Sequence, residues 1–326
     1  MSSIRLMEVC GTHTMSIAKN GIKSLLPEGV KLLSGPGCPV CVTPASVIDA
    51  ILELAMKDNV IIATYGDMVR VPGSTPGDNL ARRRAMGATV EVVYSPIDAI
   101  EIAKNNPDKE VVFLGVGFET TAPGTAACIL TAEKEKTRNF SVLSMLKTCE
   151  PAIKALEGDI DGFLLPGHVA TIIGVKGFSY LEKPGVISGF EAEDIIIALK
   201  ELLKLENTVK NEYRRAVTED GNVLAQKAIE KVFEPVTVEW RGLGFIEDSG
   251  LGIRKEYSQY DAEKKFNLKY TAKPTACRCG DVITGKIDPQ ECPLFGDRCV
   301  PEDPVGPCMV SSEGACAASY KYQWTK

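Results

Sequence analysis

From about residue 30 to residue 190, short apolar runs alternate with longer stretches of helical periodicity, and this alternation constrains the fold more than any other feature. The apolar runs have the length of buried strands and lie at 30–35, 60–66, 89–94, 111–117, 162–168 and 185–190. The helical stretches between them lie at 45–58, 76–87, 96–106 and 121–136. Such alternation is typical of parallel βαβ units, so we predict an α/β fold with open parallel sheets.

Four glycine-rich loops directly follow or overlap the ends of predicted strands, at 34–41, 64–73, 115–126 and 165–174. Ligands of open parallel sheets gather at the carboxyl ends of the strands, so we expect a ligand site there. A tight turn explains each loop taken alone. The loops could also cradle phosphate, but neither G-x-x-x-x-G-K-[ST] nor G-x-G-x-x-G occurs, so a nucleotide enzyme is the weakest candidate.

Eleven cysteines against only two histidines are the unusual part of the composition. The N-terminus lacks the pattern of a signal peptide, and no apolar run approaches the ~20 residues that span a bilayer, so we expect a cytoplasmic protein. Cytosolic thiols stay reduced, which favours metal or redox chemistry over a disulfide scaffold. The net charge of −6 offers no basic face for nucleic acid or an anionic membrane.

Six of the cysteines lie between Cys277 and Cys316, with the spacing C-x-C-x12-C-x6-C-x8-C-x7-C. Structural zinc sites usually bring two C-x2-4-C hooks to one ion, and such hooks are absent from this stretch. An iron–sulfur cube takes four thiolates from well separated loop positions, so the wide spacing suits it better. We therefore favour a cluster plus two leftover cysteines, which could form a disulfide that the cluster reduces. Zinc and ordinary buried thiols are the alternatives.

These features divide the chain into three expected domains. One α/β domain is expected over residues 28–105 and a second over residues 106–235, both as doubly wound parallel sheets. Residues 191–232 within the second domain are charged and are expected to be helical, as packing and spacer. A small cysteine-rich iron–sulfur domain is expected over residues 236–326, packed with the N-terminal segment 1–27.

A further pair of cysteines, Cys38 and Cys41, lies in the loop GPGCPVC at the end of a predicted strand. Two intervening residues allow the short sulfur separation of a disulfide. If a helix begins just after Cys41, its dipole would lower the thiol pKa and stabilise a thiolate. The pair would then accept electrons readily. Cys128 and Cys149 are instead expected to be small buried hydrophobes.

The chain resembles the HypD family of nickel–iron hydrogenase maturation proteins in MEVCGTHT (7–14), GPGCPVC (35–41), GFETTAPGTA (117–126), LPGHV (165–169) and CPLFGDRCVPEDPVGPCMVSSEGAC (292–316). The resemblance implies a scaffold on which the Fe(CN)2CO group of the hydrogenase is assembled. It implies a HypC-type chaperone and a HypE-type cyanide donor as partners. It also implies two α/β domains and a third domain that holds a 4Fe-4S cluster, in surroundings similar to those of ferredoxin:thioredoxin reductase.

Residue by residue, the resemblance implies three groups of cysteines. Four match the ligands of the cluster: Cys277, Cys292, Cys299 and Cys316. Cys279 and Cys308 match a redox-active pair beside the cluster, and Cys38 with Cys41 matches a second dithiol. On this basis electrons enter through the cluster, pass the first pair and set the state of the second. Thiol exchange requires contact, so the two pairs must approach each other or be linked by another carrier.

Cys10 in CGTHT matches the family's cysteine that holds the iron cargo together with a cysteine of the chaperone. Low-spin iron with cyanide and carbon monoxide favours soft thiolates, which makes Cys41 a second candidate ligand. Some relatives continue CGTHT with another histidine, where this chain has Met15, so His13 is the only imidazole near Cys10.

Glu119, His168 and Asp67, the last with Arg70, are auxiliary candidates for binding a partner or polarising a ligand. Loop capping and solvated ion pairs explain these polar residues as well. The alternative function is that of a thiol–disulfide oxidoreductase of the ferredoxin:thioredoxin reductase kind. A redox-active scaffold, monomeric when free and not a simple turnover enzyme, fits all the features best.

Overall fold

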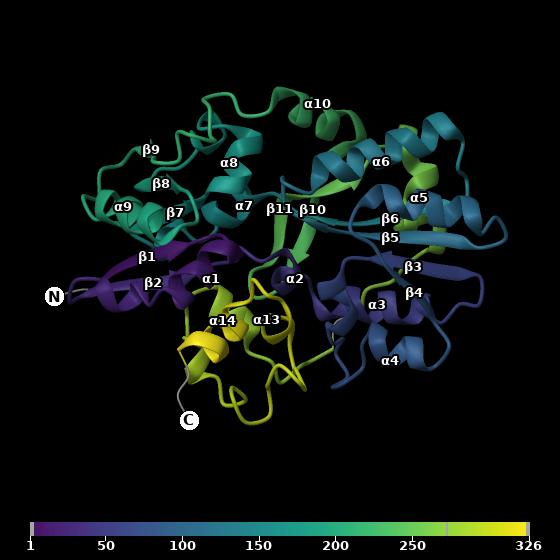
Figure 1. Cartoon of the computed structure of the whole chain (residues 1–326), viewed down its shortest axis with the longest axis horizontal. Coiled ribbons are helices and arrows are strands. Elements are labelled where there is room, and N and C mark those ends of the chain that lie inside the picture. Colours follow the sequence, from purple (N-terminus) through teal and green to yellow (C-terminus); the bar gives the residue numbers. More distant parts are fainter. Residues whose placement is uncertain (1–2, 272, 324–326) are drawn as a thin grey trace.

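The structure is a computed structural model that describes residues 3–271 and 273–323, so the expected segments 1–27 and 236–326 reach beyond it at residues 1–2, 272 and 324–326. Its strands form two parallel sheets, which lie on opposite sides of the molecule in Figure 1, and one antiparallel hairpin. Sheet A contains, in spatial order, β2 (Val30–Ser34), β1 (Ile4–Glu8), β7 (Gly162–Pro166), β8 (Gly185–Ser188) and β9 (Val209–Asn211). Sheet B contains, in spatial order, β4 (Thr89–Val92), β3 (Val60–Thr64), β5 (Glu110–Gly117) and β6 (Phe140–Leu146).

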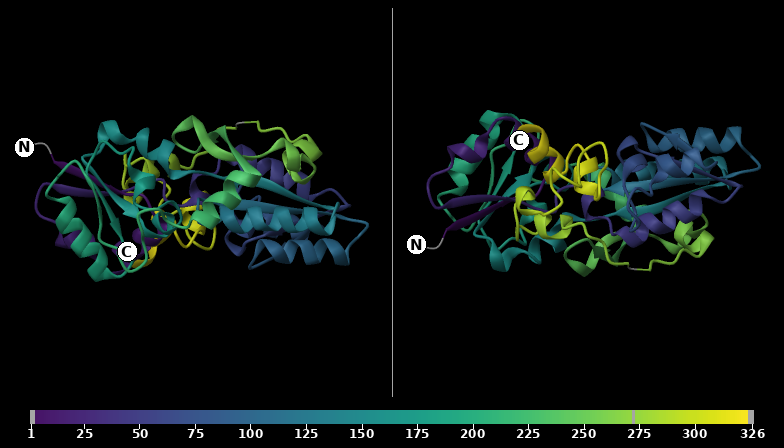
Figure 2. Two further views of the ribbon diagram at one scale, coloured as in Figure 1. Left: turned by 90° about the horizontal axis from the view of Figure 1, so that it is seen from above. Right: turned by 90° about the horizontal axis from the view of Figure 1, so that it is seen from below.

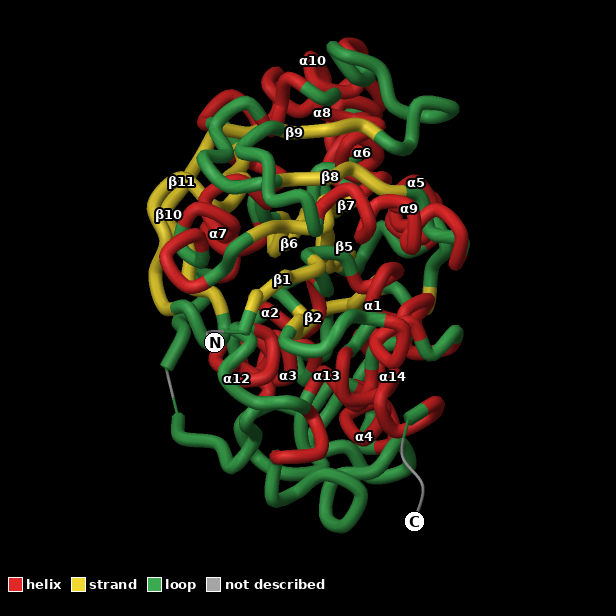
Figure 3. Tube along the Cα trace, turned by 90° about the vertical axis from the view of Figure 1, so that its left-hand side faces the viewer, coloured by secondary structure: helices red, strands yellow, loops and turns green. Residues whose placement is uncertain are grey.

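All six predicted strands are present, as β2, β3, β4, β5, β7 and β8. The α/β class with parallel sheets and a cysteine-rich segment is therefore confirmed, whereas two separate doubly wound domains stay a prediction. Figure 3 shows the five strands of sheet A side by side in the order given above. β1 lies inside the sheet, next to the edge strand β2, and its Leu6 lies opposite Leu32 of β2 and Gly162 of β7.

Helices cover both faces of each sheet. One face of sheet A packs against α1 (Gly11–Lys19) and α9 (Ala192–Leu202), and the other against α8 (Gly167–Ile173). One face of sheet B packs against α5 (Pro96–Asn105) and α6 (Ala122–Glu135), and the other against α3 (Ala45–Ala55) and α4 (Leu80–Ala85). Strands buried in this way read as continuous apolar runs, which is why the sequence revealed most of them.

Local signals explain where several of these helices begin. Ser95 and Asp98 form a capping box at the start of α5, and Pro96 occupies its first position. The Ser95 side chain accepts from the N–H of Ile97 at 3.4 Å, and Asp98 accepts from the N–H of Ser95 at 3.0 Å. Both interactions satisfy N–H groups that have no acceptor within the helix.

Each sheet contains strands from more than one of the predicted domains. The chain starts in sheet A with β1 and β2, crosses to sheet B for β3 to β6, and returns to sheet A for β7 to β9. β3 and β5 are neighbours in sheet B, although the expected boundary at residues 105 and 106 separates them. The N-terminal segment supplies β1, an interior strand of sheet A, and its helix α1 also packs against α14 (Ala315–Tyr322).

The prediction that residues 191–232 are helical throughout is wrong in the middle of that range. Only α9 and α10 (Val223–Val232) are helical there, and β9 lies between them. Leu205, which has a left-handed backbone with φ of 52°, lies just beyond the end of α9, and residues 209–211 pair with β8 as the edge of sheet A. Pairing with an existing sheet edge therefore overrides the helical propensity of this charged stretch.

The hairpin of β10 (Phe233–Trp240) and β11 (Gly244–Ile253) leads into the C-terminal region. That region contains α11 (Ala262–Phe266), α12 (Cys279–Ile283), α13 (Pro307–Val310) and α14, joined by long loops. Residues 277–316, the cysteine-rich tail, lie between the two sheets when the molecule is viewed from above and below (Figure 2). Tail residues share one hydrophobic core with residues of both sheets, so the tail is packed into the molecule.

The remaining short elements are α2 (Pro39–Val42), α7 (Cys149–Lys154), η1 (Ile22–Leu25), η2 (Gly66–Arg70), η3 (Glu157–Asp159), η4 (Lys176–Phe178), η5 (Lys255–Tyr260) and η6 (Pro289–Glu291). Within the described residues, every helix is too short or too polar to cross a membrane.

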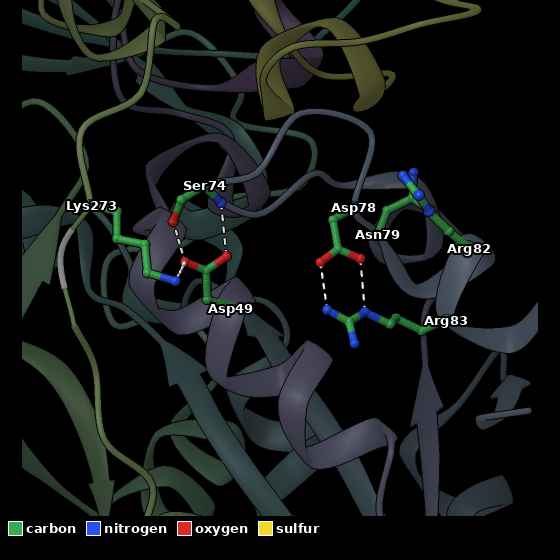
Figure 4. A network of polar contacts seen from close by, with 7 residues as sticks. All are labelled: Asp49, Ser74, Asp78, Asn79, Arg82, Arg83 and Lys273. Carbon is green, nitrogen blue, oxygen red and sulfur yellow. Dashed lines mark hydrogen bonds and ion pairs between the residues drawn. The ribbon is translucent and has the colours of Figure 1, made fainter. Parts of the chain in front are cut away.

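A network of polar contacts fixes the loop that follows η2 (Figure 4). Asp49 of α3 accepts from the N–H of Ser74 at 2.8 Å and from its hydroxyl group. Arg83 of α4 donates twice to Asp78, at 2.8 and 2.6 Å. The loop is thereby tied to both helices that cover this face of sheet B.

Candidate metal and dithiol site

The carboxyl ends of β1 and β2 bring Cys10 against the GPGCPVC loop. The N–H of Gly11 donates to the carbonyl of Gly37 at 3.0 Å. A Cβ atom on Gly37 would overlap the backbone nitrogen and Cα of Cys10, so this approach requires glycine. Two of the motifs, separated by the 20 residues 15–34, thus meet at the carboxyl ends of the strands of sheet A, where parallel sheets bind their ligands.

A disulfide joins Cys38, directly before the four-residue helix α2, to Cys41 within that helix. Cys38 is the N-cap of α2, and its Sγ accepts from the N–H of Cys41 at 3.1 Å. The predicted helix after this loop is α3, which begins at Ala45, but Cys41 itself lies within the additional short helix α2, which Pro39 starts. The helix N-terminus therefore faces Cys38 and not Cys41. Both side chains are buried.

The six tail cysteines line one cavity, with walls completed by apolar side chains. Within it, the Sγ atoms of Cys279 and Cys308 lie 2.9 Å apart, and both thiols are buried. The other four cysteines surround this pair: Cys277, Cys292, Cys299 and Cys316. Cys277 also interacts with Cys279, and Cys316 with Cys308, so the division into four ligands and one redox pair stays a prediction from the resemblance.

The cavity fits a group that binds through thiolates. A Cβ atom on Gly306 would overlap the Sγ of Cys277, so the glycine keeps the space beside this sulfur free of side-chain atoms. Burial raises the pKa of the Cys299 thiol, and a metal group must therefore displace its proton. Among residues 3–271 and 273–323, no three metal-binding side chains converge closely enough to hold one ion. The fit to an iron–sulfur group rests on the shared cavity and its soft sulfur donors.

The two sulfur pairs are neighbours in space. The Sγ of Cys279 lies 3.9 Å from the carbonyl oxygen of Cys41. The helices α12 and α13, which carry Cys279 and Cys308, both pack against α2. The sequence required such an approach for thiol exchange but could not show it, because 238 residues separate Cys41 from Cys279.

Cys10 lies in a buried polar pocket formed by its own strand and helix. Its N–H donates to Glu8 Oε2 at 3.0 Å, and the hydroxyl of Thr14 donates to Glu8 Oε1 at 2.6 Å. Burial raises the pKa of Cys10 to about 12 and that of Glu8 to about 8. Both groups are therefore protonated at neutral pH, and a metal ion must displace the Cys10 proton. Sequence reasoning missed Glu8, although it lies two residues before Cys10.

The two histidines lie on either side of Phe190, which follows β8. The ring centroid of Phe190 is 4.9 Å from that of His13 and 3.9 Å from that of His168. His13 is fully buried, and its Nε2 bonds to the carbonyl of Gly189 at 2.8 Å. Burial lowers the pKa of His13 to about 4, so its ring is neutral. Nδ1 of His13 has no hydrogen-bond partner among the described residues and is the nitrogen left for a ligand.

Glu119 lies buried at the carboxyl end of β5, on the sheet B side of the site. Its Oε1 accepts from the N–H of Cys149 at 2.7 Å, and its Oε2 has no partner within the described part of the chain. Burial raises the pKa of its carboxyl group. Cys149 is buried as expected, but it also contacts this acid, which the sequence did not suggest.

Asp67 and Arg70, on η2, both bind the cysteine-rich tail. Asp67 Oδ2 accepts from the hydroxyl of Ser311 at 3.1 Å, and Arg70 donates to the carbonyl of Pro301 at 2.5 Å. Glu313 in the same part of the tail accepts from Thr12 of α1 at 3.0 Å. These contacts make structural links between the tail and the strand-end loops of both sheets.

Comparison with known proteins gives a consistent result over nearly the whole chain. The HypD family model, described as the hydrogenase formation hypA family, matches residues 1–323. The hydrogenase maturation factor HypD2 of Bradyrhizobium diazoefficiens is 45% identical over 340 residues, covering 98% of this chain and 89% of that protein. HypD of Cupriavidus necator is 45% identical over 337 residues, covering 97% and 89% of the two chains. HypD of Escherichia coli is 43% identical over 335 residues, covering 98% and 89%. The chain therefore belongs to the HypD family of hydrogenase maturation factors.

Proposed function

We propose that this chain is the scaffold on which the Fe(CN)2CO group of nickel–iron hydrogenase is assembled. The observation that supports this most is the meeting of three groups of cysteines at the centre of the molecule. Cys10 and the Cys38–Cys41 pair lie at neighbouring strand ends, and Cys279, one of the six tail cysteines of the shared cavity, lies beside Cys41. The arrangement supports the proposal that an electron source, a thiol relay and a place for iron lie within one buried region.

Four tail cysteines would hold a 4Fe-4S cluster: Cys277, Cys292, Cys299 and Cys316. When bound, such a cluster supplies electrons one at a time at a low potential. Cys279 and Cys308 line the same cavity and touch each other, so they are placed to take up those electrons as a disulfide that becomes a dithiol. The position of Cys279 beside the Cys41 carbonyl supports onward transfer to the Cys38–Cys41 pair.

The iron atom is the cargo of this scaffold. Reduction of the Cys38–Cys41 bridge frees a thiolate at Cys41, and Cys10 supplies a second one from the adjacent strand end. Soft thiolates suit low-spin iron with cyanide and carbon monoxide ligands. Cys41 has no exposed surface and Cys10 is 9% exposed, so bulk water is largely kept from the metal. His13 Nδ1, Glu119, His168 and Asp67 are proposed as auxiliary groups around the cargo or its partners.

The partners proposed are a HypC-type chaperone, which contributes a further cysteine to the iron, and a HypE-type cyanide donor. The curated relatives are named as hydrogenase maturation factors, which supports a place within such an assembly. We further propose that the chain is cytoplasmic and monomeric when free.

A thiol–disulfide oxidoreductase acting on outside substrates is the alternative. The burial of Cys38 and Cys41, which are 4% and 0% exposed, disfavours it, because exchange requires the attacking sulfur to reach its target. Catalytic turnover of a small disulfide by the isolated chain would support this alternative.

The proposal is tested by Cys41→Ser in the anaerobically purified complex with the chaperone. We expect the infrared bands of iron-bound cyanide and carbon monoxide to disappear while the visible absorbance of the cluster persists. Cys128→Ser is the matched control, because Cys128 is a buried cysteine on α6 in a separate core, and it should keep both signals. Diatomic bands that persist in Cys41→Ser contradict the assignment of Cys41.

A further inference from the structure

The turn of the β10–β11 hairpin reaches the segment that carries the Cys38–Cys41 bridge. Figure 1 shows the hairpin ending beside α2. The N–H of Arg241 donates to the carbonyl of Val42 at 2.8 Å. Its guanidinium donates to the carbonyl of Cys41 at 3.1 Å and to that of Thr43 at 2.7 Å. Arg241 thus holds three consecutive carbonyls at the C-terminal end of α2, where a helix leaves such groups without internal partners.

The next residue of the same turn touches the segment that carries Cys279. Gly242 has φ of 83°, and a Cβ atom on it would lie 2.6 Å from the Cα and the carbonyl oxygen of Gly280. A Cβ atom on Gly280 would in turn lie 2.8 Å from the Cα of Gly242. The two backbones therefore pack directly on each other, one residue from Cys279. A single turn contacts both dithiol segments.

The bonds of Arg241 are not those of an ordinary surface ion pair. Within the described residues, no carboxylate lies in salt-bridge range of its guanidinium, and its hydrogen bonds go to backbone carbonyls. A planar guanidinium can bridge two carbonyls in a fixed geometry, which a lysine ammonium on a flexible stem does less well. The side chain is therefore suited to holding the α2 segment at a defined distance from the tail.

We propose that Arg241 is a positioning residue for disulfide exchange between the two cysteine pairs, a role that rests on the relay in the proposed function. In this exchange a Cys279 thiolate attacks the Cys38–Cys41 bridge, whose S–S bond breaks as a mixed disulfide forms. The Cys308 thiolate then releases that mixed disulfide. Two electrons pass to Cys38 and Cys41, which take up two protons, and Cys279 and Cys308 lose two protons as their own S–S bond forms.

The test measures how fast the Cys38–Cys41 bridge is reduced after dithiothreitol is added to the anaerobically purified full chain. Alkylation and mass spectrometry report each cysteine separately. We expect Arg241→Gln to slow reduction of this bridge about tenfold or more, since small misplacements of reacting groups have effects of that size. Reduction of the Cys279–Cys308 pair should keep its rate. Arg241→Lys should reduce the Cys38–Cys41 bridge at a rate between those of the unchanged chain and Arg241→Gln. If the glutamine variant does not fold, the rate of the lysine variant compared with that of the unchanged chain is the test.

Arg254→Gln is the matched control. Arg254 directly follows the same hairpin, and its Nε donates to the carbonyl of Glu230 at the end of α10, at 2.8 Å. It makes the same kind of bond away from the cysteines. We expect this variant to reduce the Cys38–Cys41 bridge at the normal rate.

A second background separates positioning from a general loosening of the loop. Cys279→Ser with Cys308→Ser removes the internal donor and should itself slow reduction of the bridge. In that background Arg241→Gln should have no further effect. An equal slowing in both backgrounds, or no slowing in either, overturns the role of Arg241. If the double serine variant reduces the bridge at the normal rate, the relay itself is wrong, and the role of Arg241 in it is wrong as well.

Discussion

The space beside Cys277 offers a direct test of the site, through the substitution Gly306→Ala. Gly306 has an extended backbone with φ of −148° and ψ of 166°, which any residue can adopt, so the substitution adds no backbone strain. Its only effect is steric. The new methyl group would overlap Cys277 Sγ and lie 3.2 Å from Cys277 Cβ.

The overlap can be relieved in two ways, and both damage the site. If the Cys277 thiol stays in place, the overpacked cavity should lower the free energy of unfolding by about 1–3 kcal/mol. If the thiol rotates away, most of that strain disappears, but a sulfur ligand leaves the cavity. We therefore expect either a lower unfolding temperature with intact iron content, or a normal unfolding temperature with loss of iron and sulfide.

The assay measures iron and acid-labile sulfide per chain, visible absorbance and thermal unfolding on the same anaerobic preparation. Gly158→Ala is the control, because no atom beyond its own chain neighbours lies within 4 Å of the Cβ position at Gly158. Its stability should change by less than about 1 kcal/mol. A Gly306→Ala protein with full iron content and an unchanged unfolding temperature would refute the geometry described for this cavity.

Two further predictions concern stability. Burial lowers the pKa of Lys147 from 10.5 to about 8, so the folded state binds this proton more weakly than the unfolded chain. The free energy of unfolding should therefore rise by about 3 kcal/mol between pH 8 and pH 10.5. Urea unfolding across that range should show that Lys147→Met abolishes most of this rise. Equal pH slopes of the free energy of unfolding in both proteins would contradict the prediction. Asp49→Ala leaves the N–H of Ser74 without its acceptor and should lower the free energy of unfolding by about 1–2 kcal/mol. Amide hydrogen exchange should become faster in residues 71–79 only. Unchanged exchange there would show that the network in Figure 4 does not hold the loop.

The alternation of apolar and helical stretches was sufficient to predict the fold class and most of the parallel strands. β6 was missed although it is a seven-residue apolar run, and the local hairpin of β10 and β11 was missed as well. The position of β1 and β9, the two other parallel strands that were missed, depends on distant partners. β1 is only five residues long and contains Arg5 and Glu8, yet it is paired on both sides, by β2 and by β7. β9 lies within a charged stretch and becomes a strand through its pairing with β8. Short polar strands carry little periodicity, so only the assembled sheet defines them.

The cysteine groups of the site could be anticipated from spacing and from the family resemblance, but their surroundings could not. The contacts of Glu8 with Cys10, of Phe190 with both histidines and of Arg241 with the Cys41 carbonyl join distant parts of the chain or depend on burial. Such contacts leave no pattern in a single sequence. The helix beginning at Pro39 could have been predicted, because proline is favoured at the first position of a helix.

The central claim is that the cysteine-rich tail holds an iron–sulfur cluster that feeds the thiol relay. Metal and acid-labile sulfide analysis of the anaerobically isolated full chain tests it most directly. We expect four irons and four sulfides per chain, with no stoichiometric zinc. A colourless protein without iron, or one with zinc bound in the tail, would contradict the account.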